Sequence, residues 1–287
     1  MCAEKWDKTS LTSCPVVSCD KYNQYPFSFS EKRFSFHMIK IICNLATEKI
    51  NEPMTKTLIL GDIHGRTLWK DIMEKEQPQQ LIFMGDYVAT HEGITAQQQI
   101  DNLEEILSLK EERPDDIILL RGNHDLQHLG YYWAECSHLS QAVQNYMATA
   151  DFRERFLSLT QWVHEFTFGD KHILCSHAGV SKVWLEETGI CDVHCINECI
   201  PSELFSFRPG RFSDHNGESC TQPCTWIRPK SLTECAVDGY VHVVGHTPQE
   251  TVTHERINDH TELWLVDALA HGSYLVLEED GFTVKQL

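Results

Sequence analysis

The chain has 287 residues, 41% of them hydrophobic, which is enough to form a sizeable core in one large domain or two small ones. Its formal net charge of -18 at pH 7 excludes a protein that coats nucleic acid, because neutralising phosphates requires an excess of Lys and Arg. Bound divalent metals reverse the local potential of a site, so an anionic substrate is compatible with this charge.

The cysteines and the hydropathy pattern bear on the compartment. Twelve cysteines in a chain of this length are typical of free thiols in a reducing compartment rather than of a small disulfide scaffold. No stretch reaches the roughly 18 apolar residues that a membrane-spanning helix needs, and the N-terminus lacks the pattern of a signal peptide. We therefore expect a cytoplasmic protein with no membrane partner and no nucleic-acid partner.

The first 53 residues differ from the rest. They contain Cys2, Cys14 and Cys19 among Ser, Thr, Tyr and Phe, and one short apolar cluster near residues 38–45. We interpret residues 1–53 as an N-terminal extension of unknown role, and residues 54–287 as the functional domain. Because Met54 directly precedes the first clear strand, one hypothesis is that translation starts there. An intact mass of the native protein that includes residues 1–53 would refute it.

From residue 54 onward, strand-like apolar runs alternate with helical patterns. In chain order we predict strands at 57–60 and 81–84, an amphipathic helix at 95–110, a strand at 117–120, a helical region at about 139–159, a strand at 173–175, a short helix at 180–187, and strands at 241–244, 262–267 and 274–278. Strands joined by crossovers predict a largely parallel or mixed sheet, with function at the carboxyl ends of the strands.

Five of these strands run directly into polar segments. The segments read Gly61-Asp62-Ile63-His64, Gly85-Asp86, Arg121-Gly122-Asn123-His124-Asp125, Ser176-His177-Ala178-Gly179 and Gly245-His246-Thr247. Any one of them alone is typical of an ordinary strand-to-turn junction, but together they predict ligands that face one crevice. Oxygen ligands mixed with imidazole suit Mn, Fe or Zn. If Asp86 bridges two ions, these would lie roughly 3.5 to 4 Å apart and would activate a shared water as the nucleophile.

These ordered motifs resemble those of the calcineurin-like metallophosphoesterase superfamily, and within it the phosphoprotein phosphatase branch, over about residues 57–247. The resemblance implies an α/β fold, a sandwich of two mixed β-sheets flanked by helices, with two divalent or trivalent metal ions, Mn, Fe or Zn, as cofactors. It also implies the ligands: Asp62, His64 and Asp86 for the first ion, and Asp86, Asn123, His177 and His246 for the second. The last motif lacks the second His of the wider superfamily, as in that branch.

The same resemblance assigns catalytic roles. His124 corresponds to the residue that protonates the leaving alkoxide, and a positioned imidazole contributes about 10² to 10⁴ in rate. Trp226-Ile227-Arg228 is similar to the Trp-x-Arg segment of bacterial and phage relatives, in which the Arg grips phosphate with its planar fork. Asn123, His124 and Arg228 would therefore bind the phosphate, and His124 and Arg228 would be catalytic.

One segment departs from the family pattern. The second motif of the family commonly continues Gly-Asp-x-Val-Asp-Arg-Gly, in which the later Asp orients the general acid and the Arg binds phosphate. Here Ala89 and Thr90 stand at those two positions, and neither has the required chemistry. Either His91, Glu92 or Asp125 substitutes, or the enzyme is slower or prefers substrates with better leaving groups.

A group of cysteines lies further along the chain. Cys191, Cys195 and Cys199 recur every fourth residue, followed by Cys220 and Cys224, with His194 and His215 nearby. A structural zinc site is conceivable. The spacing is not the usual one, however, and residues 193–207 fit an ordinary helix equally well. We expect inert thiols.

We therefore expect a metal-dependent phosphomonoester hydrolase whose catalytic domain is residues 54–287. By resemblance, its first-choice substrate is a phosphorylated protein with phosphoserine or phosphothreonine, and small phosphoesters are the wider class. One alternative is a nucleotide or diadenosine-polyphosphate hydrolase, because the same metal cradle accepts anhydrides. Another is a degenerate metal-binding interaction module that has lost turnover through the changes at Ala89 and Thr90.

Overall fold

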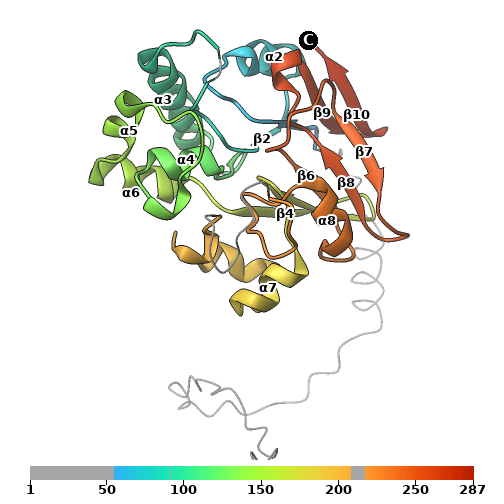
Figure 1. Cartoon of the computed structure of the whole chain (residues 1–287). Coiled ribbons are helices and arrows are strands. Elements are labelled where there is room, and N and C mark those ends of the chain that lie inside the picture. Colours follow the sequence, from blue (N-terminus) through green and yellow to red (C-terminus); the bar gives the residue numbers. More distant parts are fainter. Residues whose placement is uncertain (1–54, 91, 208–216) are drawn as a thin grey trace, which may run out of the picture. The chain divides into compact units, whose positions relative to one another are not determined.

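Two five-stranded mixed β-sheets form the centre of the computed structural model, which describes residues 55–90, 92–207 and 217–287 (Figure 1). The first sheet has the strand order β10-β9-β1-β2-β3, with bounds Gly281–Gln286, Ser273–Glu278, Thr57–Leu60, Gln80–Phe83 and Ile117–Leu119. The second has the order β4-β5-β6-β8-β7, with bounds Val163–Phe168, Lys171–Ser176, Val241–Val244, Glu262–Leu265 and Thr253–Arg256. Parallel pairing joins β1, β2 and β3 at one side of the first sheet, and β5, β6 and β8 in the middle of the second.

The strand sequences explain why the sheets pack face to face. Successive side chains of a strand point to opposite faces. In β1, Ile59 lies in the apolar layer between the sheets, together with Val243 of β6 and Trp264 of β8. Its neighbours Leu58 and Leu60 face the opposite way, into the layer beneath the helices. These strands are buried on both faces, which is why they read as continuous apolar runs.

Helices cover the outer faces of both sheets. The outer face of the first sheet packs against α2 (Leu68–Glu76), α3 (Ala96–Glu112), α5 (Gln141–Met147) and α6 (Ala150–Leu159). The second sheet packs against α7 (Lys182–Thr188), α8 (Pro229–Cys235) and the 3₁₀ helices η2 (Val193–Glu198) and η3 (Glu203–Phe205). Three short elements complete the described fold: α4 (Asn123–His128), η1 (Tyr132–Ala134) and η4 (Leu269–His271). The predicted fold class is confirmed.

Several predicted elements differ in detail from the observed ones. The helical region at 139–159 is two helices, α5 and α6, because the chain turns at Ala148 and the extended backbone of Thr149 begins a new helix. Residues 193–207 do not form an ordinary helix but the two 3₁₀ helices η2 and η3. The sequence reasoning missed the helices α2, α4 and α8 and the edge strands β4, β7 and β10.

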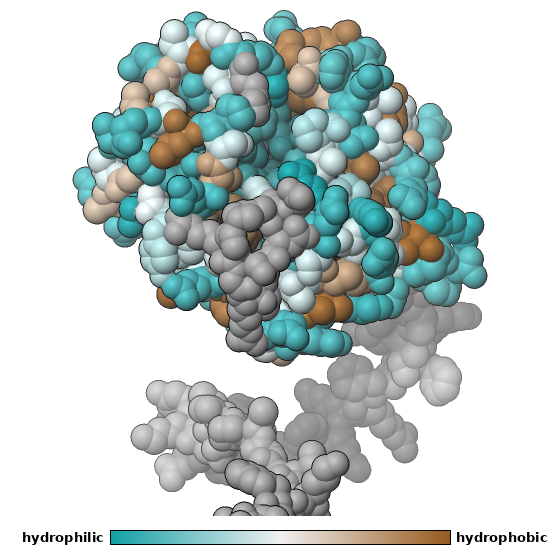
Figure 2. Space-filling view, in the orientation of Figure 1, coloured by the Kyte–Doolittle hydropathy of each residue, from teal (hydrophilic) through white to brown (hydrophobic). Residues whose placement is uncertain are grey.

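Some expectations fall outside the described residues. These are the extension at residues 1–53, the start at Met54, and the side chains of His91 and His215. Within the described ranges, no helix has the length and hydropathy needed to cross a lipid bilayer. Figure 2 shows a face on which hydrophilic side chains predominate and apolar ones form small scattered areas.

Candidate metal centre

The six predicted ligands meet at the edge where the parallel strands end. Within each of two groups, potential ligand atoms lie within 4.8 Å of one another: Asp62, His64 and Asp86 form one group, and Asp86, His177 and His246 form the other. Asp86 belongs to both, and Asn123 joins the second through its Oδ1, 3.0 Å from Nε2 of His177. All six side chains are buried. The five distant polar segments thus converge on one shared carboxylate.

The backbone at these strand ends is unusual. His64, Asp86 and His246 have φ values of 46°, 51° and 64°, in the left-handed region that side chains with a Cβ rarely adopt. Close approach explains two of the neighbouring glycines. A Cβ on Gly122 would lie 2.0 Å from Oδ1 of Asp86. A Cβ on Gly245 would likewise lie 2.3 Å from Oδ1 of Asp62. Gly122 before Asn123 and Gly245 before His246 therefore let the loops touch one another.

Hydrogen bonds fix the orientation of the imidazoles. Nδ1 of His177 contacts the carbonyl of Met84 at 2.8 Å, and Nδ1 of His64 contacts that of Val88 at 3.0 Å. Because a carbonyl oxygen only accepts, both rings carry the proton on Nδ1 and present Nε2 to the centre. Metal-binding histidines are commonly oriented in this way. Nε2 of His177 lies 3.5 Å from Oδ2 of Asp86.

His246 supplies a direct test of whether a cation fits. Its backbone N–H donates to Oδ1 of Asp62 at 3.0 Å, and its ring packs against those of His177 and Trp226. The Nε2 atom of His246 is buried and has no hydrogen-bond partner. Burial lowers the pKa of His246 well below its usual range, and the ring is therefore neutral. A buried, neutral imidazole nitrogen without a partner is a group that a metal ion would satisfy.

The charges at the site also favour cations. Burial raises the pKa of Asp62 well above its usual range, and the charge of Asp267 adds to the rise. Burial and the charge of Asp86 raise the pKa of Asp267 to about 6 and that of Asp125 to about 7. Burial opposes the charge on His177, yet the carboxylates of Asp86 and Asp62 raise its pKa to about 10. Four buried carboxylates therefore compete for a single imidazolium, and added positive charge would relieve their repulsion.

His124 follows Asn123 at the start of α4. Its backbone N–H donates to Oδ1 of Asp86 at 2.9 Å, and its ring lies edge-on to that of His64, with the ring centres 5.4 Å apart. Burial lowers its pKa to about 4. The sulfur of Cys136 lies 3.4 Å from its Nδ1.

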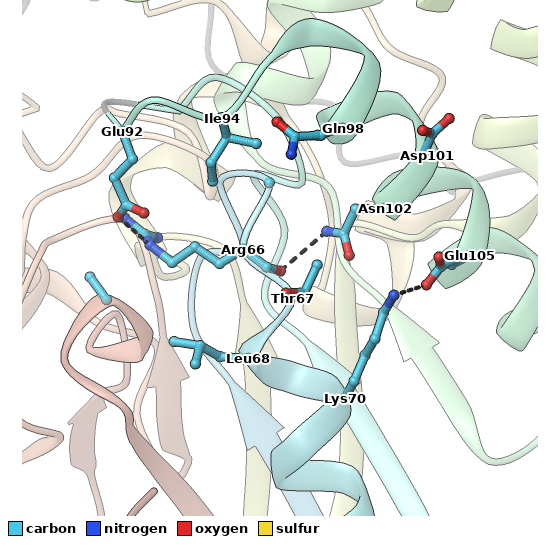
Figure 3. A pocket seen from close by; sticks show the side chains of 12 residues that line it. Arg66, Thr67, Leu68, Lys70, Glu92, Ile94, Gln98, Asp101, Asn102 and Glu105 are labelled. Carbon is cyan, nitrogen blue, oxygen red and sulfur yellow. Dashed lines mark hydrogen bonds and ion pairs between the residues drawn. The ribbon is translucent and has the colours of Figure 1, made fainter.

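Two of the three predicted substitutes for the missing Asp are engaged elsewhere. Both carboxylate oxygens of Asp125 accept backbone N–H groups, of Asp86 and Tyr87, at 2.9 Å. Glu92 forms an ion pair of 2.7 Å with Arg66, and both side chains line a pocket of about 520 Å³ (Figure 3). The third, His91, lies outside the described residues.

Arg228 lies beside the second ligand group. Its Nη1 donates to the carbonyl of His246 and to Oγ1 of Thr247, both at 3.0 Å. Its guanidinium lies 5.7 Å from the ring centre of Trp226, which in turn stacks on Phe207. The Trp-x-Arg segment thus brings a cation next to the ligand His246.

Sequence reasoning missed two residues near the centre. Asp267 is buried and follows β8 by two positions, which is the strand-end pattern that identified Asp62 and Asp86. It could have been found by that signal. Cys136 belongs to an irregular segment after η1 and carries no such signal. Among the described residues, no cysteine joins a group with metal-ligand geometry.

Comparisons with known proteins bear on the fold and the family of this chain. Among solved structures, a cold-active protein-tyrosine phosphatase from a psychrophilic Shewanella species is 18% identical with a TM-score of 0.53, over 82% of this chain and 80% of that one. A protein serine/threonine phosphatase from Saccharomyces cerevisiae is 14% identical with a TM-score of 0.49, over 82% and 80% of the two chains. A sequence model described as calcineurin-like phosphoesterase matches residues 55–262. Because that match spans well over half of the sequence, the chain belongs to the calcineurin-like phosphoesterase family and is a hydrolase.

Proposed function

We propose that the protein is a metal-dependent phosphomonoesterase that acts on phosphoserine and phosphothreonine in proteins. The observation that carries the proposal is the sharing of Asp86 by two buried ligand groups, in a chain of the phosphoesterase family. The choice of protein substrates is supported by the last motif, which has a single His, as in the phosphoprotein phosphatase branch that the sequence resembles.

The proposed cofactors are two metal ions. We assign Asp62, His64 and Asp86 to the first ion, and Asp86, Asn123, His177 and His246 to the second. Mixed oxygen and imidazole donors support Mn, Fe or Zn. When bound, such a pair polarises phosphoryl oxygens and makes water a nucleophile at neutral pH. The partnerless Nε2 of His246 and the excess of buried carboxylates support this assignment.

Three side chains would bind the phosphate and protonate the leaving group. Arg228 holds phosphoryl oxygens, because its planar guanidinium offers parallel N–H groups at the rim of the site. Asn123 offers its amide to the same phosphate. His124, in its imidazolium form, gives the proton on Nε2 to the departing Ser or Thr oxygen as the P–O bond breaks and is left neutral, since an alkoxide is a poor leaving group.

Three substrates distinguish the proposal from its alternatives. The full chain, loaded with Mn²⁺, should hydrolyse p-nitrophenyl phosphate and a phosphoserine peptide, and His124→Ala should slow the peptide reaction by about 10² or more. Hydrolysis of diadenosine tetraphosphate far faster than of the peptide would establish the nucleotide alternative instead. A protein that binds metal but turns over none of the three would be an interaction module.

A further inference from the structure

The family pattern does not identify a residue that orients His124 in this chain. Ala89 stands where the family has the orienting Asp, and its backbone N–H donates to Oε1 of Gln99. Nδ1 of His124 nevertheless has a neighbour, because Sγ of Cys136 lies 3.4 Å from it. Cys136 comes twelve residues later and approaches the ring from the segment after η1.

Gln127 holds Cys136 in place from two sides. The Cys136 thiol donates to Oε1 of Gln127 at 2.7 Å, and Nε2 of Gln127 donates to the Cys136 carbonyl at 2.7 Å. Gln127 lies on α4, four residues after Asn123, and therefore on the same side of that helix. The thiol hydrogen is thus directed at Gln127, and the sulfur lone pairs are left to accept.

The sulfur accepts from two groups of the proposed site. Nδ2 of Asn123 donates to Sγ of Cys136 at 3.5 Å, and the ring N–H at Nδ1 of His124 is the second donor within reach. Oδ1 of Asn123 itself contacts Nε2 of His177, 3.0 Å away. The second contact fixes one proton of His124 on Nδ1, so that Nε2 is the nitrogen that takes up a further proton and then gives it to the leaving group.

We propose that Cys136 is a positioning residue that orients the general acid His124, whereas Asn123 keeps its contact with His177 without it. This inference rests on the proposed function, because it assigns a partner to the acid of that reaction. A thiol is a weaker acceptor than a carboxylate and carries no charge. The acid is therefore oriented without the charge that the family's Asp provides.

The alternative is that Cys136 has only a packing role, since it packs against the apolar cluster that contains Trp133 and Trp162. Substitutions of Cys136 distinguish the orienting role from the packing role. Cys136→Ala removes the acceptor, whereas Cys136→Ser keeps an acceptor and a donor. Cys199→Ala is the matched control, because Cys199 packs against the same cluster.

The first measurement is the dependence of kcat on the leaving group, with phenyl phosphate and p-nitrophenyl phosphate as poor and good leaving groups. Cys136→Ala should lower kcat on phenyl phosphate by about 10-fold or more, as loss of an orienting partner does, and change the p-nitrophenyl reaction and both KM values little. Cys136→Ser should retain most of the wild-type rate, and Cys199→Ala all of it. Equal losses on both substrates, or equal losses in the Ser and Ala variants, would overturn the proposal.

The second measurement does not require turnover. Nitrogen-15 NMR of the histidine side chains in the metal-free protein should show His124 protonated at Nδ1, and a mixture of both tautomers in Cys136→Ala. A wild-type His124 protonated at Nε2 would refute the role of Cys136 whatever the activity. If instead the tautomer is as expected and no phosphoester is hydrolysed, the proposed function fails and the positioning contact stands.

Discussion

Asp86 has two tasks at the scale of a single residue. It is the carboxylate common to both ligand groups, and its Oδ1 accepts the backbone N–H of His124. The charge of the neighbouring His177 overcomes the effect of burial and holds the pKa of Asp86 well below its usual range. One side chain therefore couples metal binding to the position of the proposed acid.

Asp86→Asn tests this coupling with little change of shape. The amide keeps one oxygen for the N–H of His124 but loses the charge shared by two cations. We expect the metal content to fall from two ions per chain to one or none. The value of kcat/KM should fall by more than about 100-fold, because removal of an outer-shell partner already costs about 10- to 100-fold and Asp86 is a direct ligand. Metal analysis after gel filtration measures the first effect, with Asp115→Asn as an exposed control. Two bound ions in Asp86→Asn would contradict the shared role.

The residues that converge at the candidate metal centre were predictable because each follows a buried strand in the sequence. Polar groups that follow buried strands meet at one edge, so Asp62 and His246 could be paired although 184 positions separate them. Cys136 could not be predicted. The position of Cys136 depends on how the irregular segment after η1 folds back over α4. No hydrophobic periodicity in the sequence predicts that path.

At the scale of elements, the ends of β2 and β3 touch through Gly122. Gly122 has φ −97°, which any residue can adopt, so its need for hydrogen as a side chain is steric. Gly122→Ala would place a methyl group 2.0 Å from Oδ1 and 2.5 Å from N of Asp86.

We expect Gly122→Ala to lower the free energy of unfolding by about 2–3 kcal/mol, as overpacking does, and to weaken metal binding by moving Asp86. Urea unfolding and metal titration measure the two effects. Gly93→Ala is the control, since no heavy atom lies within 4 Å of its Cβ position. Equal stability of the two variants would show that the loops can separate without loss.

The edge strands that sequence reasoning missed share a physical reason. All four residues of β7, including Glu255 and Arg256, are exposed, and β10 is only partly covered. An edge strand exposed on both faces has no alternation of apolar and polar residues to detect. The parallel strands and α3 were predictable because each buries a continuous or periodic apolar set.

At the scale of the whole molecule, Glu76 joins α2 to the sheet formed by both ends of the described chain. It pairs with Lys56 beside β1 and with Lys285 of β10, and Tyr274 of β9 donates to it at 2.8 Å. Burial alone would raise the pKa of Glu76, but these partners lower it to about 2.

The lowered pKa gives a signed prediction. Because the folded-state pKa lies below the ordinary value of 4.5, the stabilisation by Glu76 is complete above about pH 4.5 and is lost as the pH falls toward 2. We expect Glu76→Gln to lower the free energy of unfolding by about 2 kcal/mol at pH 7, the scale of hydrogen bonds to charged groups. The gap to wild type should shrink below pH 4. Exposed Glu74→Gln is the control, and a gap that does not change with pH would contradict the assignment.

The left-handed backbone at His64, Asp86 and His246 has a consequence for the evolution of this protein. A residue with a Cβ loses roughly 1–2 kcal/mol in that conformation, so three of them together take up a sizeable part of a net stability of about 5–15 kcal/mol. Selection for thermal tolerance alone would favour Gly or Asn at all three positions. A heat-selected library screened without an activity assay is therefore expected to lose its reactive centre before it loses its fold.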